Sequence, residues 1–226
     1  MRAPTVETLQ RSSPVSRLAA RMPVARGCEM LLLADQRFGE LQDVAGHSPL
    51  SISTDAVWTA GELGRYLEFD AAATLDVDGV NGVSRANGCL AMIMRLRVEG
   101  DLFTWGDKMS LVAEADGTLV FTLGATPDPI SLTRTSGWDV DTWVNVVCVW
   151  GSGVDMYRNG FPLTGIAPAL TYTPTNADTD PIVIGGGAEF DLALCGLWFS
   201  GAGLAITRGI MDGTLVPAEA FEAGGG

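Results

Sequence analysis

The feature that most constrains the fold is a series of short strand-like segments joined by tight-turn pairs. Asn159-Gly160 stands between "VDMYR" and "FPL". A two-residue hairpin loop needs positive φ at both central positions, which Asn and Gly tolerate better than almost any other pair. Asp116-Gly117 separates two further segments of alternating pattern, and this is an equally recognisable hairpin signal. The sequence therefore predicts antiparallel strands connected by short turns.

The segment 143–150, "WVNVVCVW", is apolar on both of its faces. Such a strand is covered on both sides and lies in the middle of a layered structure. With the hairpin that follows, it predicts a three-stranded meander over residues 142–163. The close spacing of the remaining segments is typical of an antiparallel β-sandwich. The expected strands are residues 28–35, 65–70, 89–98, 101–105, 108–115, 118–124, 130–134, 143–150, 154–158, 181–185 and 190–200, and one helix is expected over 203–213, where Leu204, Thr207 and Met211 share a stripe.

Length and composition favour one domain. At 226 residues, 47% apolar and 18% charged, the chain is long enough to bury a sizeable core. All-β chains of this size commonly remain a single domain. We therefore expect one domain over residues 28–215, preceded by an arm of residues 1–27 and followed by a flexible tail of residues 216–226.

Charge is unevenly distributed along the chain. The net charge is −13, but residues 1–27 hold five arginines against one acid and carry +4, which leaves −17 on the rest. An acidic body repels nucleic acid and anionic membranes, because phosphate binding needs clustered cations. The basic arm favours docking onto an acidic partner, and a solvated tail with chance arginines is the alternative. The docking arginines are expected to be Arg11, Arg17, Arg21 and Arg26.

The N-terminal segment and the cysteines bear on localisation. Residues 1–27 contain no continuous apolar segment of the kind found in a secretory signal, and "EMLLLA" is too short to span a bilayer. We expect a protein that is made in a cytoplasm, without membrane insertion, and that stays there or leaves by a route that needs no signal, such as cell lysis. The cysteines are 47 to 61 residues apart and form no CxxC pair, which disfavours a zinc site and predicts buried thiols. They are Cys28, Cys89, Cys148 and Cys195.

Several segments together resemble a known superfamily. "TWVNVVCVW", "VDMYRNGFPL", "PIVIGGG", "FDLALCGLWFS" and "GLAITRGI" follow one another as in the second half of a concanavalin A-like jelly roll. The laminin-G-like members are the most similar, and "WTAGELGRYLEFD" resembles one of their early strands. The resemblance covers about residues 23–213. It implies an all-β jelly-roll sandwich with a short closing helix.

A further resemblance concerns the lead into the first strand. "MPVARGCEMLLLADQRFGELQD" is similar to the start of laminin-G-like domains in structural proteins of tailed phages and gene-transfer agents. This implies a virion protein, present in many copies or as a homo-oligomer, that contacts other virion proteins through residues 1–27. Its lectin-like domain would bind host cell-surface polysaccharide. The alternative is a structural adaptor or decoration protein of capsid or tail that binds no glycan.

The superfamily also contains glucanases, so the resemblance raises the question of catalytic carboxylates. These enzymes carry two glutamates flanking an aspartate, roughly Glu-x-Asp-x-x-Glu, on one strand. Here Glu68 and Asp70 are followed by three alanines, and the second glutamate is missing. Asp76 and Asp78 favour a turn, and His47 has no serine or cysteine partner of a nucleophile elbow. We expect no enzyme activity, and a glycan depolymerase is a minor alternative.

Calcium is the one cofactor that the resemblance raises. Many relatives bind Ca²⁺ with oxygen ligands that include an acid in the final strand. In this chain Cys195 stands at that position, and a thiol is a poor ligand for a hard cation. We therefore expect no cofactor, with calcium as the alternative. Its remaining oxygen ligands would come from Asp43, Asp70 and Asp191.

Glycan binding would use aromatic faces together with carboxylates. Trp105 and Trp138 each stand beside Asp and Gly in a predicted turn, in "TWGDK" and "SGWDVD". With Asp107 and Asp139 they are the best candidates for a sugar-contacting rim, although a turn tryptophan also commonly caps the end of a sandwich. The tryptophans expected in the core are Trp143, Trp150 and Trp198.

Overall fold

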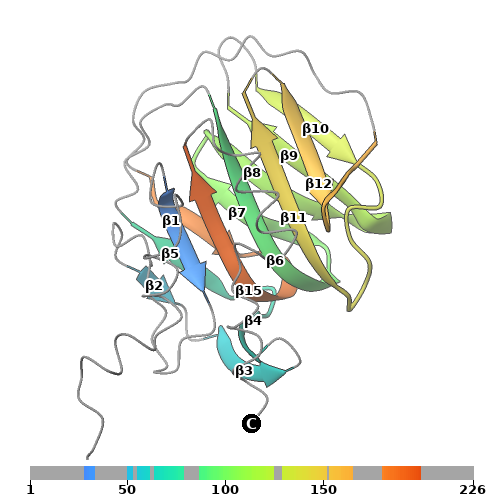
Figure 1. Ribbon diagram of the computed structural model, residues 1–226. Helices are drawn as coiled ribbons and strands as arrows, with labels where there is room; N and C mark the ends of the chain where they lie inside the picture. Colours follow the sequence, from blue (N-terminus) through green and yellow to red (C-terminus); the bar gives the residue numbers. More distant parts are fainter. Residues whose placement is uncertain are drawn as a thin grey trace, which may run out of the picture.

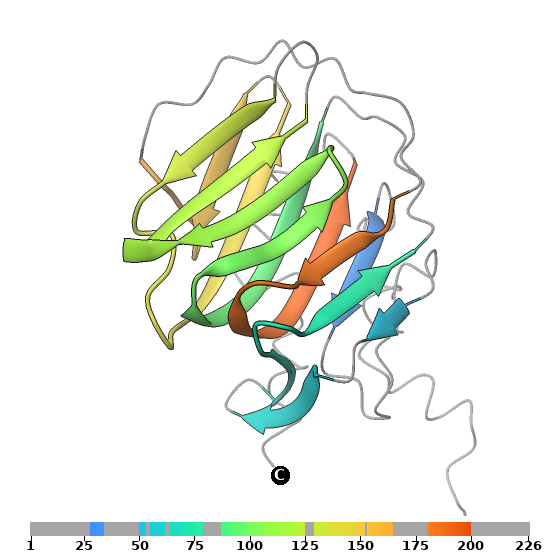
Figure 2. The same cartoon turned by 180° about the vertical axis from the view of Figure 1, so that it is seen from behind.

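The computed structural model describes residues 28–33, 50–52, 55–61, 64–78, 87–124, 129–151, 153–164 and 180–199. These residues form two antiparallel sheets packed face to face, as Figures 1 and 2 show from opposite sides. The all-β antiparallel sandwich expected from the sequence is confirmed. The arm, the tail, the expected helix over 203–213, Asp43 and His47 lie outside the described residues.

The sheet in front in Figure 1 is called sheet A, and its partner is sheet B. Sheet A has the order β13 (Phe161–Pro162), β12 (Val154–Arg158), β11 (Trp143–Trp150), β6 (Gly88–Val98), β15 (Glu189–Trp198), β4 (Gly64–Phe69) and β3 (Val57–Gly61), and β1 (Cys28–Leu33) also pairs with β15. Sheet B has the order β10 (Ile130–Arg134), β9 (Thr118–Leu123), β8 (Met109–Glu114), β7 (Gly100–Trp105), β14 (Ile182–Gly185), β5 (Thr74–Val77) and β2 (Leu50–Ile52).

The strands expected from alternation agree with the structure to within a residue or two. The meander over 142–163 is confirmed as β11, β12 and β13. Three short strands, β2, β3 and β5, were not among those expected, because three to five residues are too few for periodicity to show. The turn expected at Asp76 is wrong, since this residue lies inside β5 and pairs with Val183 of β14.

The Asn-Gly hairpin forms as predicted. Asn159 and Gly160 have φ values of 47° and 92°, the left-handed region that the turn requires. The side-chain Oδ1 of Asn159 also accepts a hydrogen bond from the backbone N–H of Asn145, 2.8 Å away. This contact ties the turn to the neighbouring strand, so the hairpin register is set by local sequence and a cross-strand bond together.

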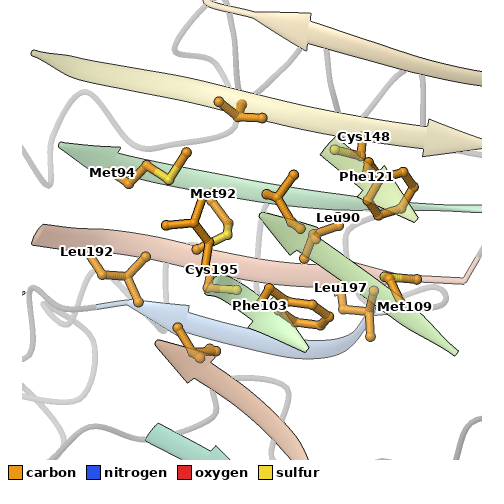
Figure 3. Close-up of a cluster of buried hydrophobic side chains, with 14 of the residues drawn as sticks. Leu90, Met92, Met94, Phe103, Met109, Phe121, Cys148, Leu192, Cys195 and Leu197 are labelled. Carbon is orange, nitrogen blue, oxygen red and sulfur yellow. The ribbon is translucent and has the colours of Figure 1, made fainter. Parts of the chain in front are cut away.

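The core lies between the sheets. Along β6 alternate side chains, Leu90, Met92 and Met94, point toward sheet B, where Phe103 and Phe121 meet them (Figure 3). This is the period-2 pattern of a strand with one face on the core. Cys148 and Cys195 belong to the same cluster, and burial raises the pKa of both thiols. Together with the buried Cys89, they confirm the prediction for three of the four cysteines, and the side chain of Cys28 lies outside the described residues.

One edge of β15 is shared by two other strands. Residues Phe190–Leu192 pair with β4, and Leu194–Trp198 pair with β1, while the opposite edge of β15 pairs with β6 throughout. The register shifts between Leu192 and Leu194, which is where the first partner gives way to the second. A bulge at this point re-aims the strand and allows both pairings.

A glycine close to the end of β15 makes room for a large ring. A Cβ added at Gly196 would lie 2.2 Å from a ring carbon of Trp198. We expect Gly196→Val to lower the free energy of unfolding by about 1–3 kcal/mol, the usual cost of overpacking. Urea unfolding measures this. Gly153→Ala is the matched control, because nothing lies within 4 Å of its Cβ, and equal losses in both variants would contradict the explanation.

Candidate functional site on the outer face of sheet A

The outer face of sheet A, which points away from sheet B, carries a row of four side chains across four neighbouring strands. Glu68 of β4 pairs with Asp191 of β15, Asp191 with Arg95 of β6, and Arg95 with Trp143 of β11. Directly paired residues in antiparallel strands point to the same face, so the register alone brings these groups together. Arg97, two residues beyond Arg95, shares that face.

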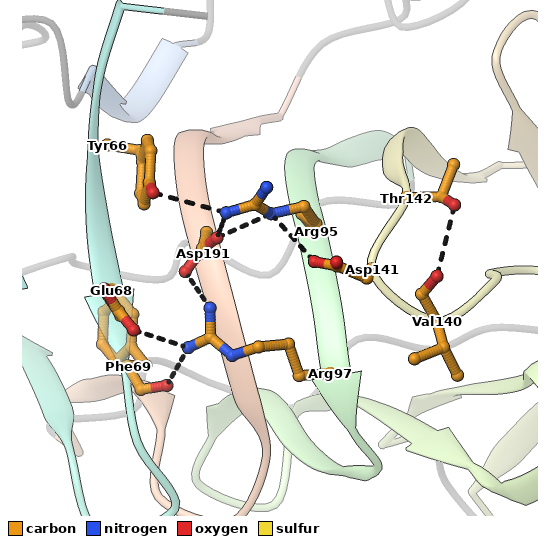
Figure 4. A network of polar contacts seen from close by, with 9 residues as sticks. All are labelled: Tyr66, Glu68, Phe69, Arg95, Arg97, Val140, Asp141, Thr142 and Asp191. Carbon is orange, nitrogen blue, oxygen red and sulfur yellow. Dashed lines mark hydrogen bonds and ion pairs between the residues drawn. The ribbon is translucent and has the colours of Figure 1, made fainter. Parts of the chain in front are cut away.

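Asp191 is the centre of this row. Its carboxylate is 0% exposed. Nε and Nη2 of Arg95 donate to Oδ2 at 2.8 Å and 2.5 Å, and Nη1 of Arg97 donates to Oδ1 at 2.5 Å (Figure 4). A buried charge is tolerated only when it is paired and hydrogen-bonded, and here two guanidinium groups satisfy one carboxylate.

Arg95 also packs beside two aromatic rings. Its guanidinium carbon is 5.5 Å from the ring centre of Tyr66 and 5.4 Å from that of Trp143, and the two rings meet edge to face with centroids 5.5 Å apart. Such cation–π contacts hold the guanidinium in place. The hydrogen bond to Asp191 raises the pKa of Arg95 above its ordinary value, and burial opposes that rise.

The row remains accessible at its sides. The side chains of Glu68 and Asp141 are 43% and 67% exposed, and they form ion pairs with Arg97 at 3.2 Å and with Arg95 at 3.5 Å. We call Glu68, Arg95, Arg97, Asp141 and Asp191 the ion cluster; it contains three carboxylates and two guanidinium groups. The cluster together with Tyr66 and Trp143 therefore offers aromatic carbon, hydrogen-bond donors and hydrogen-bond acceptors on one surface.

The structure corrects the predicted sugar-contacting rim. Trp105 and Trp138 are 3% and 4% exposed. Their indole N–H groups donate to the backbone carbonyls of Asp180 and Thr118, at 3.2 Å and 3.1 Å. A buried indole with a satisfied N–H contributes to the core and offers no ring face to a ligand. Asp107 and Asp139 are exposed, but Asp107 forms an ion pair with Lys108 and Asp139 forms one with Arg158.

The expected calcium ligands have other partners. Asp191 is held by two arginines, which corrects the metal role expected for it. Oδ1 of Asp70 accepts hydrogen bonds from the backbone N–H groups of Ala72 and Ala73 and stabilises a turn. In the described ranges no group of three or more His, Cys, Asp or Glu side chains could hold a metal ion.

Sequence reasoning did not select Arg95, Arg97 or Tyr66, and it assigned Trp143 to the core. The available signal was "MRLRV", in which two arginines alternate with apolar residues at the end of a long apolar segment. Such alternation predicts two cations on one face of a strand. Their carboxylate partner, Asp191, is about a hundred positions away, so the cluster requires the strand pairing to be known.

Comparisons with known proteins concern the fold. No protein-family model and no curated protein matches the chain. Similar solved structures include the binding domain of Paraclostridial Mosquitocidal Protein 1, with TM-score 0.69, 11% identity, and 83% of this chain and 52% of that chain covered. The receptor binding domain of botulinum neurotoxin D has a TM-score of 0.68 and 11% identity, with 84% of this chain and 54% of that chain covered. The binding domain of Botulinum Neurotoxin DC in complex with SialylT has a TM-score of 0.67 and 11% identity, with 85% of this chain and 52% of that chain covered.

Identity this low establishes a shared fold and nothing more specific. The chain spans about half the length of these structures. In the part of the chain that the structure describes, no helix is long and apolar enough to cross a membrane.

The pairing of Asp191 generates a stability prediction. Asp191→Asn leaves two guanidinium groups without their buried counter-charge. We expect a loss of about 3 kcal/mol, the lower end for a broken buried pair, because both arginines keep some contact with water. Asp139→Asn, which breaks an exposed pair with Arg158, should cost at most about 1 kcal/mol. Denaturant unfolding of the two variants compares them, and a smaller loss for Asp191→Asn would contradict this account.

Proposed function

We propose that this protein is a non-enzymatic, carbohydrate-binding component of a phage-like particle that attaches to host surface polysaccharide. The sandwich fold, which it shares with receptor-binding domains that include one in complex with SialylT, supports recognition rather than catalysis as the working hypothesis. The sequence resemblance to laminin-G-like domains of virion proteins supports the particle context. The ligand surface is the outer face of sheet A.

The location of the ligand surface rests on one observation: aromatic and accessible polar groups from four strands meet on the outer face of sheet A. Sugars are bound through their C–H surfaces by aromatic rings and through their hydroxyls by carboxylates and guanidinium groups. Trp143 supplies a half-buried ring, while Glu68 and Asp141 supply exposed oxygens. The ion pairs pre-orient these groups, which lowers the entropy lost on binding.

Charge indicates the class of sugar. Two guanidinium groups face three carboxylates in the ion cluster, and the chain as a whole carries −13. An anionic sugar would meet net negative charge, because the arginines are already neutralised. The site therefore favours a neutral polysaccharide over one that contains sialic or uronic acid.

Glycan-array binding tests the site. Trp143→Ala should weaken binding of a neutral glycan at least about tenfold, since losing an aromatic platform removes on the order of 1–3 kcal/mol. Phe161→Ala is the control, because Phe161 is an exposed aromatic outside this row, and it should bind like the parent protein. Thermal unfolding confirms that both variants are folded. Unchanged binding by Trp143→Ala, or preference for acidic glycans, would contradict the assignment.

The arm has a separate role in the proposal. Residues 1–27 carry +4 against the acidic body, so we assign to them the contact with other virion proteins. Removing residues 1–27 should leave a folded, glycan-binding domain that no longer incorporates into particles. Co-sedimentation with particles measures incorporation, and a shortened chain that still incorporates would contradict this role.

A structural adaptor without glycan binding is the second candidate. Phe161 is 74% exposed on β13, a two-residue strand that is the last in the order of sheet A among the described strands. Exposed aromatic side chains on a sheet edge are suited to contacts between subunits. Under this alternative Phe161→Ala would reduce assembly and Trp143→Ala would not, which is the reverse of the result expected above.

A further inference from the structure

The turn between β10 and β11 brings a third carboxylate to the ion cluster. Asp141 lies in this turn, its side chain is 67% exposed, and Oδ1 is 3.5 Å from Nε of Arg95. The two arginines of the cluster already have two carboxylate partners, because Asp191 pairs with both and Glu68 pairs with Arg97. Asp141 is therefore the surplus charge that makes the cluster net negative. An exposed ion pair contributes little to stability, so its presence calls for another explanation.

The backbone holds Asp141 in this place. Its φ of 56° lies in the left-handed region, which few residues other than Gly, Asn and Asp adopt at low cost. Its N–H donates to the carbonyl of Leu96 at 2.7 Å, and Leu96 follows Arg95 in β6. The N–H of Thr142 donates to the carbonyl of Asp139 at 3.3 Å and closes the turn. Such conformations persist where the surroundings fix them, and they are common at binding sites. The carboxylate is therefore held beside Arg95 before any ligand binds.

Asp141 differs from the other two carboxylates in its hydrogen bonds. Asp191 accepts from both arginines, and Glu68 accepts from Oγ1 of Thr59 at 3.1 Å. None of the described residues donates a hydrogen bond to the carboxylate of Asp141, whose 3.5 Å ion pair is longer than an ordinary hydrogen bond. Nη1 of Arg95 points away from Asp191 in Figure 4 and also donates to none of the described residues. Both groups are therefore open to a ligand.

We propose that Asp141 is a specificity-determining residue that excludes acidic sugars from the outer face of sheet A. This inference rests on the proposed carbohydrate-binding function and names the residue that sets the sugar class. Discrimination between ligands commonly needs a repulsive element as well as attractive contacts. An arginine beside aromatic rings would otherwise attract the carboxylate of a uronic or sialic acid. With Asp141 in place, a sugar hydroxyl finds a hydrogen-bond acceptor, whereas a sugar carboxylate meets a like charge.

Two variants at Asp141 test this role against a matched control. Asp141→Asn removes the charge and keeps the size, and Asn tolerates the left-handed backbone. Asp141→Gly removes the whole carboxylate, suits a φ of 56°, and adds no amide donor that could itself bind an acidic sugar. The control is Asp139→Asn, because Asp139 lies two residues away in the same turn, is 64% exposed, and pairs with Arg158 instead of Arg95. All three substitutions change the net charge by the same amount.

The probes are immobilised oligosaccharide pairs whose sugar units differ only in a hydroxymethyl group or a carboxylate: glucose with glucuronic acid, galactose with galacturonic acid, and mannose with mannuronic acid. The parent protein should bind the neutral member of at least one pair. The ratio of acidic to neutral binding should rise at least about tenfold in both Asp141 variants, because a like charge is removed, and should stay unchanged in Asp139→Asn. In about 1 M salt, where the screening length is about 3 Å, the parent ratio should move toward that of the Asp141 variants.

The outcomes separate this inference from the proposed function. Neutral binding by the parent protein, with the same ratio in the Asp141 variants as in Asp139→Asn, would overturn the role of Asp141 and leave carbohydrate binding intact. Loss of neutral binding in the Asp141 variants without a gain for acidic members would also overturn it, because Asp141 would then be only an acceptor. A parent protein that binds no pair and no glycan on the array would overturn both. Thermal unfolding identifies the folded variants, and either Asp141 variant alone suffices for the comparison.

Discussion

The antiparallel register between β6 and β15 is the constraint on which the rest of the structure depends. It pairs Met94 with Leu192 toward sheet B and, one residue along, Arg95 with Asp191 toward the outer face. Because side chains alternate, a slip of one residue would exchange the two faces and place a guanidinium in the core. The hydrophobic core and the ion cluster therefore both favour the observed pairing of β6 with β15, because each would be disrupted by a register slip of one residue.

The outer face of sheet A combines two environments on one set of strands. Around Arg95 it is polar, with the buried carboxylate of Asp191 neutralised by two arginines and flanked by Tyr66 and Trp143. Toward Cys89 and Trp198 it is apolar and buried. The first environment suits a hydroxyl-rich ligand, because it offers aromatic carbon, hydrogen-bond donors and hydrogen-bond acceptors on one surface.

The sequence predicted the fold well because its signals are local. Alternation over five or more residues identified the long strands, and Asn159-Gly160 identified the hairpin through the positive φ that those residues tolerate. The short strands were missed, since β2 has only three residues and β5 only four. Trp105 and Trp138 were placed at the surface because each stands beside turn residues, but nearby backbone carbonyls satisfy their indole N–H groups and allow burial.

The candidate site could not be predicted in the same way. The sequence by itself determined the long strands, the reversal at Asn159-Gly160 and the burial of Cys89, Cys148 and Cys195, because these follow from side-chain period and backbone preference. Only the tertiary structure decided that Asp191 lies beside Arg95 and Arg97, and that Trp143 points to the outer face. Electrostatic and aromatic contacts act between neighbours in space, and β-sheet pairing makes neighbours of residues far apart along the chain.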